Sequence, residues 1–79
     1  MAKNVIIYST PTCVYCKMAK EFFQKNNVKY VEHNVAEDDE AREEMVNKSH
    51  QLGVPVIDIG GEVHVGFNRA ELERALGLK

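Results

Sequence analysis

The chain has 79 residues, enough for one compact domain with a small hydrophobic core, and we assign residues 1–79 to that domain. Its composition is 44% hydrophobic and 28% charged without a low-complexity stretch, which excludes a disordered or fibrous protein. The formal net charge of -2, with no stripe of basic residues, argues against nucleic acid or an anionic membrane as a partner.

The N-terminal segment points to a cytoplasmic protein. Its first apolar run, Val5 to Tyr8, is too short for the core of a secretion signal or for a membrane span. The run is rich in β-branched residues and is followed by Ser9-Thr10-Pro11-Thr12. It therefore predicts a buried strand that ends in a loop.

A helix, a second strand and a second helix are predicted next. Between Val14 and Lys25 apolar residues recur at helical spacing, and Asn26-Asn27 is typical of a helix end. The segment Val28 to Val35 has the composition of a strand. The acidic run Glu37 to Glu40 then suits the first turn of a helix, because the helix macrodipole favours negative charge there.

The C-terminal third predicts a hairpin and a last helix. Val54 to Ile59 and Glu62 to Val65 are typical of strands, and the intervening Gly60-Gly61 is a two-residue hairpin signal. Asn68 is predicted to cap a helix whose apolar stripe ends at Gly77.

The resulting order of elements is β-α-β-α-β-β-α. A strand, a helix and the next strand form a parallel pair through a right-handed crossover, and the hairpin extends the same sheet. We therefore expect an α/β protein with a single mixed sheet and helices on both faces, which is the minimal thioredoxin-type arrangement.

The two cysteines, Cys13 and Cys16, stand where the first strand meets the first helix. Thiol–disulfide exchange needs a thiolate that attacks and a second thiol close enough to form an intramolecular disulfide. The helix N-terminus favours an anion at Cys13, and Cys16, one turn further on, should be more buried. The pattern predicts Cys13 as the nucleophile and Cys16 as the resolving thiol. Lys17 and Lys20 add positive potential, which solvent and salt weaken.

Two other interpretations of the cysteine pair stay open. A structural disulfide would close a very small loop and contribute only about 2 kcal/mol in the chain-entropy model. A C-x-x-C pair also binds metals, so an iron–sulfur cluster or metal carrier, with the pair shared in a dimer, is the alternative function. One chain offers few ligands, because His33, His50 and His64 do not follow zinc-finger spacing, and we expect no metal site.

The segment Thr12-Cys13-Val14-Tyr15-Cys16, together with the later Val54-Pro55 and Gly66, resembles the glutaredoxins over essentially the whole chain. The resemblance implies a thioredoxin fold, a cis peptide bond before Pro55, and a Val54 backbone that pairs with an extended substrate. It also implies contacts with substrate or glutathione for seven residues: Thr12, Tyr15, Val54, Pro55, Gly66, Phe67 and Asn68.

Three departures from the family pattern concern the electron donor. Thr10 occupies the position at which glutathione-dependent members usually have lysine, and Gly53 replaces the threonine of their Thr-Val-Pro segment. Asn68 stands in the segment that is acidic in those members, and we expect it to act first of all as an N-cap. The Gly66-Phe67 pair is similar to that of the NrdH-redoxins, which receive electrons from thioredoxin reductase.

The resemblance thus implies a dithiol oxidoreductase that reduces protein disulfides, glutathione mixed disulfides, or both. Its electrons are expected from glutathione, as a co-substrate, or from a flavoprotein of the thioredoxin reductase type. Its expected partners are disulfide-containing proteins, with ribonucleotide reductase as a further candidate. We expect a monomer without a bound cofactor.

Asp58 falls within the apolar strand before the hairpin. A buried acid at this position could accept the proton of Cys16. An alternating strand, however, turns every second residue to solvent, so we expect Asp58 to be exposed.

Overall fold

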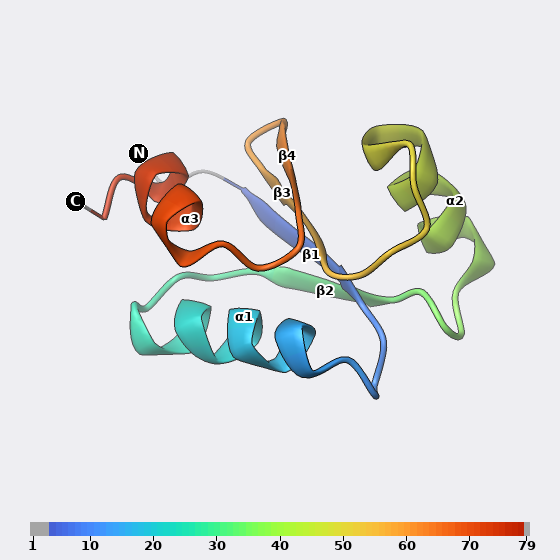
Figure 1. Cartoon of the computed structure of the whole chain (residues 1–79), viewed down its shortest axis with the longest axis horizontal. Coiled ribbons are helices and arrows are strands. Elements are labelled where there is room, and N and C mark those ends of the chain that lie inside the picture. The colour runs from blue at the N-terminus through green and yellow to red at the C-terminus, as the bar shows by residue number, and fades with distance from the viewer. Residues whose placement is uncertain (1–3, 79) are drawn as a thin grey trace.

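The computed structural model describes residues 4–78, so Met1–Lys3 and Lys79 of the predicted domain lie outside it. The described residues form seven elements in the predicted order (Figure 1). Their bounds are β1 Val5–Ser9, α1 Val14–Lys25, β2 Val31–Asn34, α2 Asp39–Ser49, β3 Val56–Ile59, β4 Glu62–Val65 and α3 Arg69–Leu76.

The described strands form a four-stranded sheet in the order β2-β1-β3-β4. β1 and β2 are parallel, with α1 as the crossover between them, whereas β1 pairs with β3 and β3 with β4 in antiparallel fashion. Gly60 and Gly61 make the β3–β4 turn at φ of 58° and 98°, which glycine adopts without steric cost. The predicted mixed sheet and its hairpin are confirmed.

Two hydrophobic clusters lie on opposite faces of the sheet, because successive side chains of a strand point to opposite sides. The first cluster joins the sheet to α1 and α3 and includes Ile7, Phe23 and Leu72. The second joins the sheet to α2 and includes Tyr8 and Met45. The helices therefore cover both faces, with α1 and α3 on one and α2 on the other.

β2 is shorter than the predicted strand and begins at Val31 rather than Val28. Asn27 has a φ of 57°, and the N–H of Val28 still bonds to the carbonyl of Phe23 at 2.8 Å. These residues close the end of α1, so the parallel ladder starts only where Ile6 pairs with Val31.

β3 is also shorter than predicted and begins at Val56 rather than Val54. Pro55 has no N–H to donate to the ladder, and the first pairing with β1 joins Val56 to Tyr8. Along β3 every residue is buried, since the strand has neighbours on both sides and helices on both faces.

Asp58 on β3 is buried, so the expectation that it faces solvent is wrong. Its exposed fraction is 9%, and both of its carboxylate oxygens have partners within the fold. Lys48 Nζ donates to Oδ2 at 2.8 Å, and the N–H of Gly61 donates to Oδ1 at 2.8 Å. Ile57 and Ile59 beside it belong to the cluster under α1 and α3, which places Asp58 on the α2 face.

α2 begins two residues later than the acidic run that predicts it. Asp38 is the N-cap, and its side chain accepts the N–H of Ala41 at 3.0 Å. Asp39 and Glu40 then lie in the first turn, where the macrodipole favours them, and Glu37 precedes the helix. None of the helices described within residues 4–78 is long and apolar enough to cross a membrane.

Candidate active site at the start of α1

Cys13 is the N-cap residue of α1. It has extended backbone angles, φ -88° and ψ 114°, and its N–H bonds to the carbonyl of Thr10 at 3.3 Å. Its Sγ accepts the N–H of Cys16 at 3.1 Å, so the sulfur takes the place of the oxygen that usually caps a helix. An anion at this sulfur would strengthen that hydrogen bond. The side chain is partly exposed and within reach of a partner molecule.

Cys16 lies one turn further into α1 and is 0% exposed. Both cysteines are free thiols in the structure. Burial, followed by the hydrogen bond with Cys13, raises the pKa of the Cys16 thiol to about 12. The two thiols therefore differ as the sequence predicted, with one accessible and the other shielded and protonated.

Pro55 lies at the end of the sheet from which the cysteine loop leaves. The ladder pairs Val56 with Tyr8, so Pro55 is next to the last residue of β1. The peptide bond before Pro55 is cis, as the family resemblance implied, and the side chain is buried. On its other side, the N–H of Gly66 donates to the Pro55 carbonyl at 2.8 Å. The topology thus brings three separated motifs to one end of the sheet.

Exposed side chains surround the accessible cysteine. Thr12 is exposed immediately before Cys13, and Val14 and Tyr15 are 69% and 61% exposed immediately after it. The side chains of Val14 and Tyr15 present an exposed apolar surface directly beside the accessible thiol. Thr12 and Tyr15 therefore flank the accessible thiol, and their contact with a substrate stays a prediction.

The remaining predicted contact residues also contribute to the fold. Val54 is partly buried against the cluster under α2. Phe67 is partly buried, and its ring centroid lies 6.0 Å from that of Phe22 in an edge-to-face arrangement. Asn68 caps α3, since its Oδ1 accepts the N–H of Glu71 at 3.2 Å, which confirms the predicted N-cap.

A groove of about 510 Å³ runs between α1 and the start of α3. Its walls combine apolar side chains with cationic ones, and it is lined by Met18, Glu21, Phe22, Lys25, Asn26, Phe67 and Arg69. Phe67 is the predicted contact residue that lines it. The groove therefore continues the exposed surface of α1 away from the cysteines.

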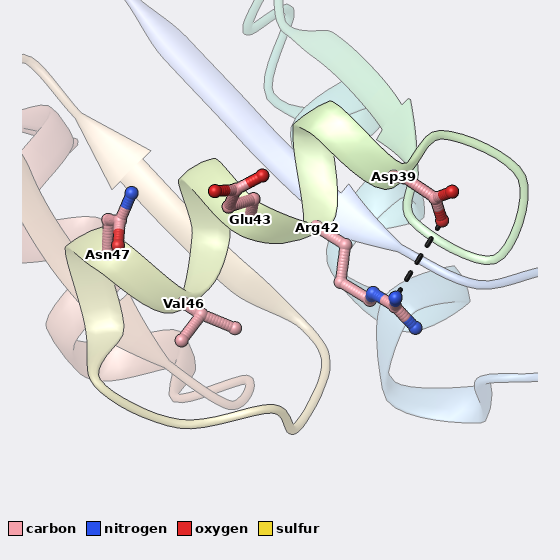
Figure 2. Close-up of a pocket in the computed structure, with 5 residues that line it drawn as sticks. All are labelled: Asp39, Arg42, Glu43, Val46 and Asn47. Carbon is pink, nitrogen blue, oxygen red and sulfur yellow. Dashed lines mark ion pairs between the residues drawn. The ribbon is translucent and has the colours of Figure 1, made fainter.

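A second hollow, of about 380 Å³, lies on the surface of α2 (Figure 2). It is lined by Asp39, Arg42, Glu43, Val46 and Asn47. The dashed line in Figure 2 marks the ion pair between Asp39 and Arg42. Its nitrogen and oxygen atoms are 3.7 Å apart. None of the predicted site residues lines this hollow. Because α2 packs on the face of the sheet opposite α1, the hollow is separate from the cysteine site.

The histidines lie on three different elements. His33 of β2 stacks on Tyr8 with ring centroids 5.4 Å apart, His50 ends α2, and His64 of β4 lies 2.9 Å from Glu62. Across residues 4–78, no three His, Cys, Asp or Glu side chains are grouped so that they could hold a metal ion.

Lys20 is the residue near the cysteines whose environment the sequence did not reveal. It was expected to be an exposed lysine with a weak field, but its Nζ bonds to Glu32 of β2 at 2.8 Å and its side chain is 27% exposed. Glu32 belongs to a different strand, so no local pattern along the chain links the two residues. The sequence could have indicated only that Lys20 lies near Cys16, because a spacing of four residues puts both side chains on one face of the helix.

Comparison with known proteins decides the family. The profile of the family described as Glutaredoxin matches residues 5–65, from β1 to β4. The chain belongs to the glutaredoxin family. Membership in this family indicates thiol–disulfide oxidoreductase chemistry.

Relatives support the same family assignment. This glutaredoxin-family chain is 51% identical over 70 residues to an uncharacterized glutaredoxin-like 8.6 kDa protein in the rubredoxin operon of Clostridium pasteurianum, covering 89% of this chain and 93% of that protein. It is 36% identical over 63 residues to glutaredoxin 3 of Escherichia coli K12, covering 80% of this chain and 75% of that protein.

Solved structures support the fold. The thioredoxin-like protein BC3987 superimposes with a TM-score of 0.87 and 34% identity, over 92% of this chain and 100% of that one. A glutaredoxin from Archaeoglobus fulgidus gives a TM-score of 0.84 and 25% identity, over 95% of this chain and 86% of that one. The predicted thioredoxin-type fold of this glutaredoxin-family chain is therefore confirmed.

Proposed function

We propose that the chain is a dithiol thiol–disulfide oxidoreductase in which Cys13 is the nucleophile and Cys16 the resolving thiol. The observation that carries this proposal is the asymmetry of the pair. Cys13 is accessible and its sulfur accepts an N–H bond at the start of α1, whereas Cys16 is fully buried behind it. An accessible thiol meets the substrate first, and a buried neighbour acts only after the first bond has formed.

The reaction proceeds in two exchange steps. The Cys13 thiolate attacks one sulfur of a substrate disulfide, a mixed disulfide forms, and the first half of the substrate leaves as a thiolate that takes up a proton. Cys16 then attacks the sulfur of Cys13, releases the second half, and leaves a disulfide between the two cysteines. A glutathione mixed disulfide is reduced by Cys13 alone, with a further thiol completing the cycle.

Substrate contacts are proposed for the residues around this pair. Thr12 and Tyr15 flank Cys13, and Gly66 and Pro55 are bonded to each other at the same end of the sheet. The backbone of Val54, which precedes β3, is proposed to pair with an extended segment of the substrate. Phe67 and Asn68 would contact the same ligand from the start of α3, although both also serve the fold.

The electron donor is proposed to be glutathione or a flavoprotein of the thioredoxin reductase type. Asn68 already uses its side-chain oxygen as a cap, and Thr10 supplies no positive charge beside the cysteine loop. Both observations argue against a preformed binding site for glutathione. We further propose that the chain acts in the cytoplasm as a monomer, without a resident cofactor, on disulfide-containing proteins such as ribonucleotide reductase.

The test is turnover of NADPH in two separate assays, one with glutathione and its reductase and one with thioredoxin reductase. NADPH turnover in either assay supports the proposed oxidoreductase function, and the assay with the faster turnover identifies the electron donor. Turnover in neither would contradict the proposal and favour the metal-binding alternative, which anaerobic purification and visible absorbance would then test.

Variants of the two cysteines assign their roles. Cys13→Ser should abolish both reduction of protein disulfides and deglutathionylation. Cys16→Ser should abolish the first and keep the second, because only the first requires a resolving thiol. Loss of both activities in Cys16→Ser, in a protein that still folds by circular dichroism, would contradict the monothiol route.

A matched variant tests the glutathione contact. Thr10→Lys adds the cation that glutathione-dependent members usually carry, at a partly exposed loop position that precedes the exposed Pro11 and Thr12. If glutathione binds along this loop, the KM for glutathione should fall about threefold to tenfold, as expected for one added charge pair near the surface. An unchanged KM would contradict glutathione binding in this place.

A further inference from the structure

Three polar side chains form a cluster on the face of the sheet that carries α1. Lys20 Nζ of α1 bonds to Oε2 of Glu32 on β2 at 2.8 Å, and Ser9 Oγ at the end of β1 donates to the same carboxylate oxygen at 2.8 Å. Ser9 is 1% exposed, so the cluster reaches from the helix surface into the interior. The carboxylate is thus held by one partner from a helix and one from a strand.

The cluster lies next to the resolving cysteine. Lys20 follows Cys16 by four positions, so the two side chains share one face of α1, with Cβ atoms about 5–6 Å apart. Burial and Cys13 raise the pKa of Cys16, whereas a backbone hydrogen bond from Thr10 and, to a smaller extent, the charge of Lys20 lower it. The carboxylate of Glu32 raises the pKa of Lys20, which keeps the ammonium charged at neutral pH.

The other elements on the face of the sheet that carries α1 present apolar side chains to it. β3 contributes Ile57 and Ile59, and α3 contributes Leu72 and Ala75. Asp58 is directed to the opposite face, where it is paired with a lysine of α2, so it is not the proton acceptor that the sequence left open.

In the resolving step, negative charge develops on the sulfur of the buried Cys16, and a nearby positive charge would stabilise it. Cys16 must attack as a thiolate, yet burial, the largest cause of its raised pKa, disfavours the ionised thiol at neutral pH. Bulk water does not reach a side chain that is 0% exposed. Negative charge that develops on the Cys16 sulfur must therefore be stabilised from within the protein.

We propose that Lys20, anchored by Glu32 and Ser9, is a positioning residue for the resolving step, whose ammonium group stabilises negative charge on Cys16 as this sulfur attacks Cys13. This inference rests on the proposed function. In the step, the bond between the two cysteine sulfurs forms while the bond from Cys13 to the substrate sulfur breaks. The proton lost by Cys16 is balanced by the proton that the departing substrate thiolate takes up, and no further oxidant or reductant is needed.

The experiment follows the reduced protein mixed with dithiobis(nitrobenzoate), an aromatic disulfide that releases a coloured thiolate at each exchange. The first release reports attack by Cys13, and the second reports resolution by Cys16. In stopped-flow absorbance the two phases separate the steps within a single turnover. A single release in the unsubstituted protein would contradict the proposed dithiol function itself, before any question about Lys20 arises.

The decisive variant is Lys20→Met, which removes the charge and keeps a long apolar side chain. We expect the second phase to slow about tenfold at pH 7, and its pH profile to move about one unit upward, while the first phase changes less than twofold. Lys20→Arg, which keeps a cation beside Cys16, should restore the second phase to within about threefold. Lys17→Met removes an exposed lysine of the same helix, whose potential solvent and salt weaken, and should slow the second phase less than twofold.

A second variant keeps the test valid if Lys20→Met folds poorly. Glu32→Gln leaves the lysine in place but removes the charge that anchors it, so the second phase should slow by a smaller factor, about threefold. The proposal is overturned if the second phase of Lys20→Met or Glu32→Gln keeps its rate and pH profile. It is also overturned if both phases slow equally, because that would indicate general disturbance of the site.

Discussion

Lys48 of α2 places its Nζ atom 2.8 Å from Oδ2 of Asp58 on β3, across the face of the sheet opposite the cysteines. The same ammonium donates to the hydroxyl of Tyr8 at 2.8 Å, and that hydroxyl is bonded to Glu44. Lys48 thus connects α2 to the two central strands through hydrogen bonds and an ion pair. Because these contacts lie apart from the cysteine pair, we expect them to stabilise the fold rather than to take part in the reaction.

Lys48→Met should lower the free energy of unfolding by about 2 kcal/mol, because it leaves the carboxylate of Asp58 buried without its cationic partner. The lysine side chain is 27% exposed and that of Asp58 only 12%, so solvent replaces little of the lost interaction. Urea unfolding followed by circular dichroism measures the change. The control is Arg42→Met, which breaks the exposed pair with Asp39 and should cost less than about 0.5 kcal/mol.

The contribution of this pair should also disappear in acid. Burial alone would raise the pKa of Asp58, but the hydrogen bonds from Lys48 and from the Gly61 N–H outweigh it and hold the pKa below its usual range. An acid whose pKa is lower in the folded protein than in the unfolded chain stabilises the folded protein at pH values above its unfolded-state pKa, about 3.9. This stabilisation is lost as the pH falls through the folded-state pKa. The stability gap between the unsubstituted protein and Lys48→Met should therefore shrink below about pH 4. A gap that stays constant to pH 2 would contradict the assignment.

The sequence predicts most of the fold because its signals are local. The bounds of α1, the two-residue hairpin turn and the cap of α3 each depend on neighbouring residues, and all three are confirmed. The starts of β2 and β3 were wrong by two or three residues, because strand ends depend on which residues find a partner in the ladder.

In the candidate site, too, features that depend on neighbouring residues were predicted, and contacts between distant elements were not. The asymmetry of Cys13 and Cys16 follows from their positions at a helix start, so the sequence could predict it. The burial of Asp58 could not be predicted, because its partner Lys48 comes from another element. The contact of Lys20 with Glu32 was missed for the same reason: a salt bridge between a helix and a strand leaves no periodic signal.

The two thiols should differ sharply in alkylation. With iodoacetamide at pH 7, the reduced protein should gain one carbamidomethyl group, at Cys13, because Cys16 is 0% exposed and burial raises its pKa to about 12. Peptide mass spectrometry assigns the site. In concentrated urea both cysteines should react at similar rates, which is the control. Equal labelling in the folded protein would contradict the shielding of Cys16.

Gly66 should be sensitive to substitution for conformational reasons alone. Its φ is +81°, and an added Cβ would meet nothing within 4 Å, so space does not limit the side chain. Gly66→Ala should therefore lower the free energy of unfolding by about 1–2 kcal/mol through backbone strain, measured by urea unfolding. Gly66→Asn is the matched variant, and it should cost less although its side chain is larger, because asparagine adopts positive φ more readily. If asparagine cost more than alanine, side-chain volume rather than backbone conformation would determine the residue at this position.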